Sequence, residues 1–432
     1  MSDLPVAAFE YQVGGPLAWD HPTYIERQAD LDLRAAIAGG ELGIVTAPPQ
    51  SGKSSLRLQM AQDAREQGYL PVSLSATVLT SQDQRLWDQK LAAAIYQSLS
   101  NGQLAHLQAS SSSFDQLFRR HSFEGTAFGG RSESVFTHYQ PQLEKWFAKT
   151  ANFLPPQRVE QFTRDVLLPV AEQVPLVIFI DDAEALLDIP FLAHDVMDWI
   201  AYCYSLRRVY PIYQNLKFVL LGTAPLLKLT QNETLLAQCR AIALENFELA
   251  DVGCLRPGIA PAIQDVQAVL AAILTWTGGQ PLLTQYMCQT VSRLGGRLAA
   301  PHGQPLAPLS ETLVQWIDQT VYSYVIEDWR QQASGDHLQR LWNSVLASPM
   351  TVDMPASADV KALLRAVLSE ALIFFDGSDA QKMLLLNGII MRCNNRLQIA
   401  NEIYRQVFGT LMQPLPLQDA LDTAYLDATD GP

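Results

Sequence analysis

The sequence APPQSGKS fills residues 47–54, between the apolar run Leu42–Thr46 and a helix-like stretch from Ser54 to Gly68. A Gly-Lys-Ser between a strand and a helix meets the needs of a phosphate-binding loop, because backbone N–H groups at the helix start point at the anion. Lys53 adds a full positive charge, and the hydroxyl of Ser54 can ligate Mg²⁺. This stretch therefore predicts an α/β domain that binds phosphate groups.

The loop departs from the usual pattern at its beginning. Ala47 replaces a glycine whose main purpose is to permit a tight turn, and Pro48 and Pro49 lack N–H groups. These three residues precede the donors, which start at Ser51. A chance surface loop is the alternative, and the strand before it and the helix after it argue against that interpretation. The residues expected to bind the nucleotide here are Gln50, Ser51, Gly52, Lys53, Ser54 and Ser55.

A second motif, LVIFIDD at residues 176–182, is an apolar run that ends in two carboxylates. Such a run is typical of a strand buried on both faces of a parallel sheet, and open α/β sheets bind ligands at the carboxyl ends of their strands. We expect Asp181 to hold Mg²⁺ together with Ser54, directly or through water. Asp182 or Glu184 would orient or deprotonate the attacking water, although Asp182 is shorter than the glutamate common at this position. A solvated acidic turn is the alternative for this motif alone. The expected catalytic residues are Lys53, Asp181, Asp182 and Glu184.

Alternating strand and helix patterns predict an α/β fold with a parallel sheet and crossover helices, and the phosphate-loop motif makes it a P-loop NTPase. Strands are expected at residues 42–46, 70–74, 176–180, 217–221 and 241–244. This ATPase domain would span residues 1–247. It would contain a mainly helical insert at about 82–173, interrupted by a Ser-rich and a Gly/Ser-rich break.

Beyond Phe247 the strand pattern gives way to helical spacing of apolar residues. One helix is expected over Val266–Leu274, with Gly278 or Gly279 as its stop signal. Pro281 opens a second helix, which we expect to end at Gly295-Gly296. This pattern predicts a helical lid domain at residues 248–300, followed by a Pro- and Gly-containing linker at 301–308.

The remaining segment combines helices with a hairpin. Helices are expected after a cap at Asp336, over Lys361–Ile373 and within Gln381–Leu386. Asn394-Asn395 suits a hairpin turn between two strand-like runs, because asparagine tolerates positive φ. This order predicts a winged-helix domain at residues 309–408, followed by a loose acidic tail at 409–432.

The amino-acid composition indicates which binding partners and which cellular compartment to expect. The net charge of −14 argues against broad contact with DNA or RNA, although a local basic patch would still allow it. Five cysteines are scattered without a CxxC pair, which favours buried thiols in a reducing compartment over disulfides or zinc. The N-terminal residues lack a signal-peptide pattern, and no apolar stretch reaches the ~18 residues of a membrane span. We therefore expect a cytoplasmic protein of two or three domains without a membrane segment.

The motifs together resemble those of the bacterial, mainly cyanobacterial, AAA-like domain family of STAND-class P-loop ATPases. The resemblance covers about residues 11–408 and depends on the order and spacing of several segments. These segments are YQVGGPL at 11–17, PTYIERQAD at 22–30, QSGKSSLR at 50–57, IFIDD at 178–182, FVLLG at 218–222, WTGGQP at 276–281 and residues 397–408.

The resemblance implies further site residues. Arg27, before the first helix, would lie by the nucleotide, and the Pro281 of Gly279-Gln280-Pro281 would pack against adenine. Thr223 matches a position that senses the γ-phosphate, without the arginine that strong sensing requires. From the residues alone, Arg27 is also typical of a solvated helix start, and Gly279 and Pro281 of helix punctuation. The implied cofactors are ATP or ADP with Mg²⁺. Three arginines could act on a neighbouring subunit's nucleotide or be ordinary surface residues: Arg207, Arg208 and Arg240.

Three functions are consistent with these patterns. The first is an ATP-dependent switch with slow hydrolysis, which couples its nucleotide state to assembly or to a partner protein in signalling or defence. The second is a DNA-associated ATPase of the loader or transposition-regulator type, for which Arg392, Arg396 and Arg405 give the expected wing some positive charge. The third is a scaffold that binds nucleotide without turning it over.

Overall fold

The computed structural model describes residues 9–80, 83–107, 136–223, 229, 232–261, 263–299, 310–346 and 357–413. The chain divides into two compact units. The sheet unit comprises Pro16–Ala47 and Gly52–Glu245, and the helical unit comprises Met1–Gly15, Pro48–Ser51 and Asn246–Pro432. The expected Ser- and Gly-rich breaks, the linker at 301–308 and the tail from residue 414 lie outside the described residues.

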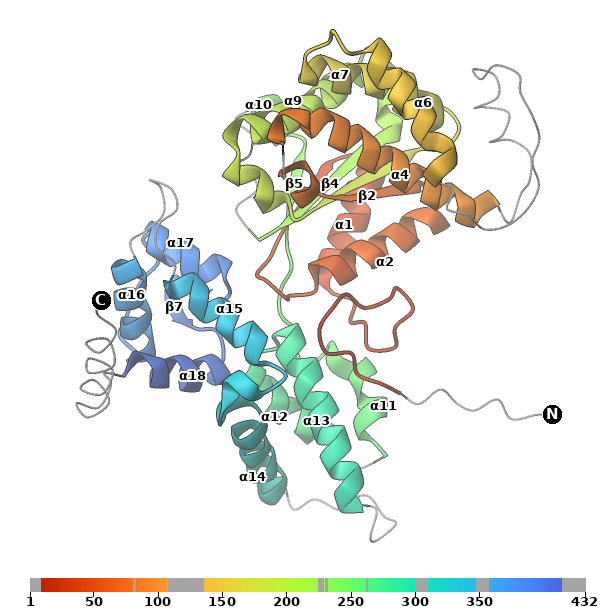
Figure 1. Ribbon diagram of the computed structural model, residues 1–432. Coiled ribbons are helices and arrows are strands. Elements are labelled where there is room, and N and C mark those ends of the chain that lie inside the picture. Colours follow the sequence, from red (N-terminus) through yellow and green to blue (C-terminus); the bar gives the residue numbers. More distant parts are fainter. Residues whose placement is uncertain are drawn as a thin grey trace, which may run out of the picture. The chain divides into compact units, whose positions relative to one another are not determined.

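A five-stranded parallel sheet forms the centre of the sheet unit, with the strand order β2-β3-β4-β1-β5 (Figure 1). All five predicted strands are confirmed, with ends that differ from the predicted ones by at most two residues. Every residue of β3 and β4 is buried, as expected for strands covered on both faces. The strand bounds are β1 Leu42–Thr46, β2 Leu70–Ser75, β3 Leu176–Asp181, β4 Leu216–Gly222 and β5 Cys239–Ala243.

Helices cover both faces of this sheet (Figure 1). Alternate residues of β3 face opposite ways, so that Val177 and Phe179 join one core and Ile178 joins the other. The first core includes Leu33 of α1 and Leu56 of α2. The second core is contributed by α4, α7 and α9. The helix bounds are α1 Gln28–Gly39, α2 Lys53–Glu66, α3 Thr77–Thr80, α4 Trp87–Leu107, α6 Phe136–Lys149, α7 Pro155–Phe162, α8 Leu168–Ala171, α9 Pro190–Leu206 and α10 Glu233–Leu236.

Short helical turns join these elements, and the described part of the expected insert is helical. The 3-10 turns are η1 Gln84–Leu86, η3 Ala183–Asp188 and η4 Pro211–Asn215, and the π turn is η2 Thr163–Leu167. Among the residues described, no helix combines the length and the apolar character required to cross a membrane.

The first part of the helical unit after β5 consists mainly of helices and short helical turns. α12 ends at Thr277, where Gly278 adopts a left-handed conformation, so the predicted helix stop is confirmed. A Cβ at Gly278 would lie 2.5 Å from the carbonyl oxygen of Ala400, so this close approach requires glycine. α13 continues to Ala299, past its predicted end. The bounds are η6 Val252–Leu255, α11 Arg256–Ile259, α12 Val266–Thr277, α13 Pro281–Ala299, α14 Ser310–Val321, η7 Tyr322–Ile326 and η8 Trp329–Gln331.

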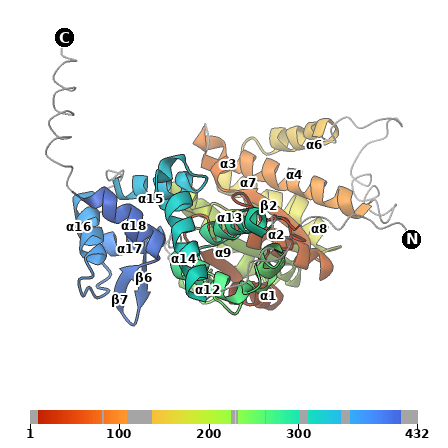
Figure 2. The same cartoon turned by 90° about the horizontal axis from the view of Figure 1, so that it is seen from below.

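The predicted hairpin near the C-terminus is confirmed (Figure 2). β6 pairs antiparallel with β7, and both turn residues, Asn394 and Asn395, have positive φ, as a two-residue hairpin loop demands. Three helices precede this hairpin. The assignment of this segment as a winged-helix domain stays a prediction. The bounds are α15 Gly335–Leu346, α16 Ser357–Leu368, α17 Asp379–Leu386, β6 Ile390–Cys393, β7 Arg396–Ile399 and α18 Glu402–Met412.

Two predicted helix ends in this segment are wrong. The helix expected to reach Ile373 stops at Leu368, because Glu370 turns left-handed and the following residues pair with β7. The carbonyl of Ile373 accepts a hydrogen bond from Leu397 N–H at 2.9 Å, and Phe374 bridges to the same strand. Asp336 lies in the first turn of α15 rather than at its cap.

A buried histidine should make the stability of this protein depend on pH. Burial lowers the pKa of His337 to about 3, with nearby Arg340 acting in the same direction. Below about pH 6.5 the unfolded chain binds a proton at His337 that the folded chain does not bind. The contribution of neutral His337 to the free energy of unfolding is therefore fully present above about pH 6.5 and falls as the pH drops toward 3. We expect urea denaturation to show an acid loss of about 1.4 kcal/mol per pH unit from this group.

Replacing His337 with Gln should remove that contribution to the acid loss. The matched control is His194→Gln, because the side chain of His194 is 74% exposed. A pH dependence that is the same in the wild type and in both variants would contradict the assignment.

Candidate nucleotide-binding site

The phosphate loop follows β1, and the acidic motif follows β3, at the carboxyl ends of parallel strands. Gly52 caps α2 with φ 94°, a left-handed conformation that glycine adopts without strain. Lys53 and Ser54 form the first turn of α2, where unpaired N–H groups and the helix dipole favour an anion.

Lys53 is buried, with 9% of its surface exposed. Its Nζ donates to the carbonyl oxygen of Ala47 at 3.0 Å. Burial lowers the pKa of Lys53, while Glu184, Asp181 and Asp182, in that order of strength, act to raise it. A lysine that is partly desolvated and faced by three acids can exchange these partners for phosphate oxygens.

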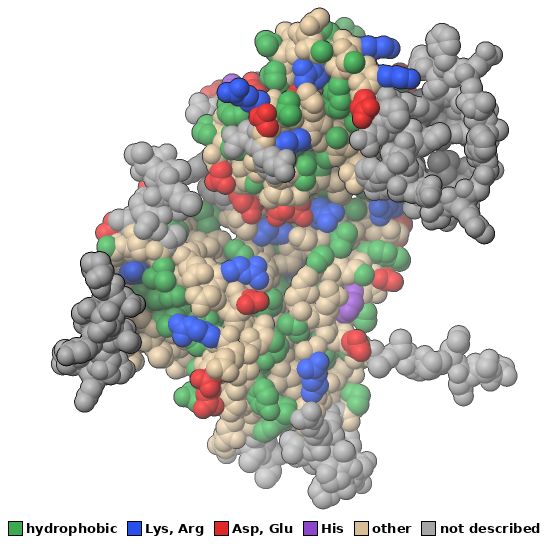
Figure 3. Space-filling view, viewed as in Figure 1, with side chains coloured by type: hydrophobic (Ala, Val, Ile, Leu, Met, Phe, Trp, Pro, Cys, Tyr) green, Lys and Arg blue, Asp and Glu red, His purple; other side chains and the backbone are tan. Residues whose placement is uncertain are grey.

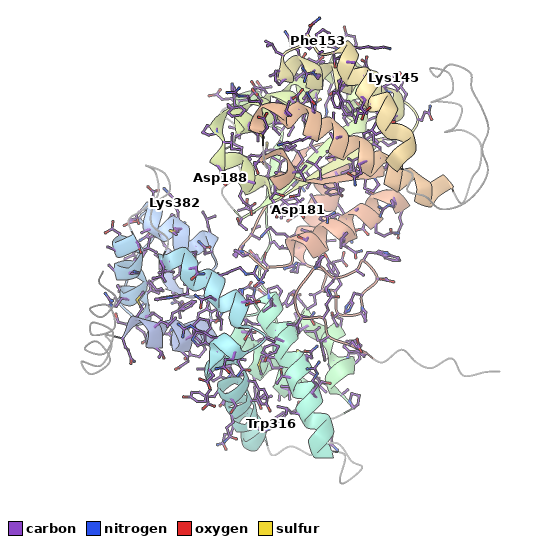
Figure 4. The ribbon with its side chains drawn as sticks, in the orientation of Figure 1. Lys145, Phe153, Asp181, Asp188, Trp316 and Lys382 are labelled. Atoms are coloured by element: carbon purple, nitrogen blue, oxygen red, sulfur yellow. The ribbon has the colours of Figure 1, made fainter. Side chains whose placement is uncertain are left out.

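Asp181 lies at the end of β3, beside the start of α2 (Figure 4). Its Oδ2 accepts a hydrogen bond from Ser54 Oγ at 3.3 Å and one from Arg57 Nε at 3.0 Å. Its Oδ1 accepts from the backbone N–H of Asp182 at 3.1 Å. Ser54 and Asp181, expected to share the metal, are therefore adjacent.

The donor set suits Mg²⁺, because a hydroxyl and a carboxylate are hard oxygen ligands. Across the described ranges, no group of three or more His, Cys, Asp or Glu residues could hold a metal ion by itself. An ion beside Ser54 and Asp181 would therefore take its remaining ligands from water and phosphate oxygens, as Mg²⁺ at a nucleotide does.

The two other acids are held by hydroxyl groups. Ser75 Oγ, at the end of β2, donates to Asp182 Oδ2 at 2.8 Å. Glu184 accepts two hydrogen bonds from Thr223, from the backbone N–H at 3.0 Å and from Oγ1 at 2.9 Å. Glu184 and Thr223 were expected at the site for separate reasons, and the structure brings them into contact.

Arg27 lies beside Gly52 at the start of α2, and its expected place by the nucleotide stays a prediction. Its guanidinium is 3.1 Å from the position that a Cβ on Gly52 would take, and its Nη1 donates to the carbonyl oxygen of Glu245 at 3.0 Å. Arg27 is 8% exposed, which argues against a solvated helix start. Ser55 accepts from the backbone N–H of Leu17 at 3.0 Å, so its hydroxyl holds the preceding segment.

The other expected binding residues belong to the helical unit and are described within it. Gln50 has φ 59°, and its carbonyl accepts from Gln280 Nε2 at 3.1 Å. Ser51 donates to the carbonyl of Pro48 at 2.7 Å. A Cβ at Gly279 would lie 2.0 Å from the carbonyl oxygen of Phe247, so the backbone packing alone requires glycine there. Pro281 is the first residue of α13.

Arginines elsewhere in the sheet unit make structural contacts. Arg207 stacks on Tyr204 and donates to the carbonyls of Gly40 and Leu216. Arg240 pairs with Glu41 at 2.8 Å. Arg57 was not among the residues expected at the site. Its position four residues after Lys53, on the same helix face, was the available signal.

Comparisons with known proteins identify the family that this chain resembles. Residues 138–298 match the model of the AAA-like domain, a range that contains Asp181 and Gly279 but not the phosphate loop. A curated relative, an uncharacterized WD repeat-containing protein of Synechocystis sp., is 28% identical over 402 residues, which are 92% of this chain. The chain spans 30% of the length of that relative.

Three solved structures illustrate how distant the structural matches are. A Walker-type ATPase of Pyrococcus abyssi has TM-score 0.45 and 13% identity, covering 91% of this chain and 98% of its own. The ORC2 protein of Aeropyrum pernix has TM-score 0.40 and 11% identity, covering 89% and 92%. The RuvB branch migration motor of Thermotoga maritima has TM-score 0.38 and 14% identity, covering 93% and 99%.

The fold class follows from the strand order and the two motifs. The chain has an α/β fold with a parallel five-stranded sheet, and its expected resemblance to the AAA-like domain family is confirmed by the match over residues 138–298.

Proposed function

We propose that this protein is a nucleotide-dependent switch that binds ATP or ADP with Mg²⁺ and hydrolyses ATP slowly. The observation that supports it best is the meeting of the α2 start with Asp181, where Ser54 Oγ lies 3.3 Å from the carboxylate. Lys53 and the N–H groups of α2 would bind the phosphates, and Ser54 and Asp181 would hold the metal. Bound Mg²⁺ neutralises charge on the phosphate oxygens during phosphoryl transfer.

Glu184 is the acid we favour for orienting the attacking water. It acts more strongly on Lys53 than Asp181 or Asp182 does, and it is held by Thr223, the expected γ-phosphate sensor. Asp182 accepts its hydrogen bond from Ser75 Oγ at 2.8 Å instead, a contact that does not join it to the expected sensor. Hydrolysis would be slow without an arginine finger, which contributes about 10³–10⁵-fold, and two of the three candidate arginines, Arg207 and Arg240, are engaged in contacts of their own.

The switch would depend on differential contacts of the two nucleotides. ATP supplies a γ-phosphate that ADP lacks, and only such a difference can shift an equilibrium between two conformations. Following the family resemblance, Gly279 and Pro281 would contribute to the adenine site, and the helical unit would carry the conformational change. The curated relative is a longer, WD repeat-containing protein, which favours a partner protein for this chain. This coupling to a partner protein would act in signalling or defence.

The DNA-associated alternative has less support. Arg405 pairs with Glu370 and with Glu402, and Arg392 stacks over Phe375. On the face of the described residues in Figure 3, the Lys and Arg side chains are dispersed among acidic ones. DNA binding requires a continuous positive surface, so this arrangement favours a protein partner over DNA.

Lys53→Ala should weaken nucleotide binding. Loss of the charged contact to the phosphates is expected to raise the ADP dissociation constant about 10–100-fold, as for a hydrogen bond to a charged group. Isothermal titration calorimetry with Mg²⁺·ADP measures the change. The control is Lys145→Ala, because Lys145 is exposed on α6 and lies apart from Asp181 (Figure 4). Equal affinity in both variants and the wild type would refute the assigned phosphate site.

Glu184→Gln should slow ATP turnover by about 10²–10⁴-fold, the range for a lost general base, and leave ADP affinity within about threefold. Asp182→Asn, the matched variant, should slow it less. Single-turnover hydrolysis measures both. The reverse order would assign the water to Asp182 instead.

Assembly should respond to the nucleotide. We expect multi-angle light scattering to give a larger mass with a non-hydrolysable ATP analogue than with ADP, and no such change for Lys53→Ala. A mass that is independent of nucleotide would exclude the assembly part of the proposal and leave coupling to a partner.

A further inference from the structure

Arg57 forms an ion pair with the carboxylate that is expected to hold the metal. Its Nε lies 3.0 Å from Asp181 Oδ2, the same oxygen that accepts from Ser54. The two side chains are 19% and 11% exposed, so the pair is largely shielded from solvent. Shielding from solvent strengthens the direct attraction between the two charges and reduces its screening by salt.

The helix geometry fixes this arrangement. Arg57 follows Lys53 by four residues on α2, and residues at this spacing share one helix face. The loop directs Lys53 toward the expected phosphate position. The next turn of α2 therefore carries Arg57 beside the end of β3. Two cations on one helix face therefore flank Ser54, one beside the loop and one beside Asp181.

A carboxylate next to a bound polyphosphate repels it unless a cation lies between or beside them. Mg²⁺ is the usual cation at such a site. At this site Asp181 already has the Arg57 guanidinium at hydrogen-bonding distance, 3.0 Å from Oδ2.

We propose that Arg57 is a positioning residue that holds and neutralises Asp181, so that the site keeps nucleoside diphosphate when Mg²⁺ is absent. The inference rests on the proposed function. Mg²⁺ and Arg57 compete for Asp181 Oδ2, so the same contact lowers the affinity of the nucleotide complex for the metal. ADP is then retained over a range of Mg²⁺ concentrations.

A purely structural contact is the alternative, in which Arg57 only ties α2 to β3. Loss of such a tie would lower stability and nucleotide affinity to a similar extent with and without metal. The dependence of ADP affinity on Mg²⁺ separates the two, because only the proposed neutralisation is replaced by the metal ion.

The test compares ADP affinity by calorimetry in excess Mg²⁺ and in EDTA. For the wild type we expect the two dissociation constants to differ by less than about tenfold. For Arg57→Ala we expect them to differ by about 100-fold, because in EDTA this variant has no cation beside Asp181. Arg57→Lys keeps the charge and should remain near the wild type. Arg65→Ala is the matched control, since it removes a cation from α2 about 12 Å further along the helix.

A double variant tests whether Asp181 is the group that Arg57 acts on. Arg57→Ala combined with Asp181→Asn should recover binding in EDTA, because no uncompensated carboxylate remains. Equal Mg²⁺ dependence in Arg57→Ala and the wild type, or no recovery in the double variant, would overturn the inference. Absence of ADP binding by the wild-type protein in both buffers would instead refute the proposed function itself, and this inference with it.

Discussion

The hydrogen bond between Ser54 and the Asp181 carboxylate joins the beginning of α2 to the end of β3. These residues are far apart in the sequence, and they meet because the two strands that carry them lie in one parallel sheet with β4 between them. Parallel strands present all their carboxyl ends at one edge, so the loop after β1 and the acids after β3 face the same space. The proposed chemistry depends on this constraint.

The sheet can hold that edge rigid because its inner strands are fully buried. β3 and β4 are covered on both faces by two separate cores, one with α1 and α2 and the other with α4, α7 and α9. Asp181 is the last residue of β3 and Thr223 directly follows β4, so the packing of these strands positions both residues. Hydroxyl groups then hold the acids in place, Ser75 on Asp182 and Thr223 on Glu184.

Much of this arrangement could be predicted from the sequence, because long apolar runs and the Gly-Lys-Ser motif have few other interpretations. The five strands, the helix stop at Gly278 and the turn at Asn394-Asn395 followed from local chemistry. Local patterns failed where tertiary pairing decides. The apolar residues after Leu368 fit a helix equally well, and only the β7 partner makes them extended. The spacing of Arg57 from Lys53 indicates its helix face, but its contact with Asp181 depends on how distant strands pair in the sheet.

The central claim is that one metal ion lies between Ser54, Asp181 and the phosphates of a bound nucleotide. Electron–nuclear double resonance on Mn²⁺, used in place of Mg²⁺ with ADP, tests it most directly. The account predicts a ³¹P coupling from Mn²⁺ bound to the wild-type protein, and its weakening or loss in Ser54→Ala. Mn²⁺ bound without a phosphorus coupling, or a coupling unchanged by Ser54→Ala, would contradict it.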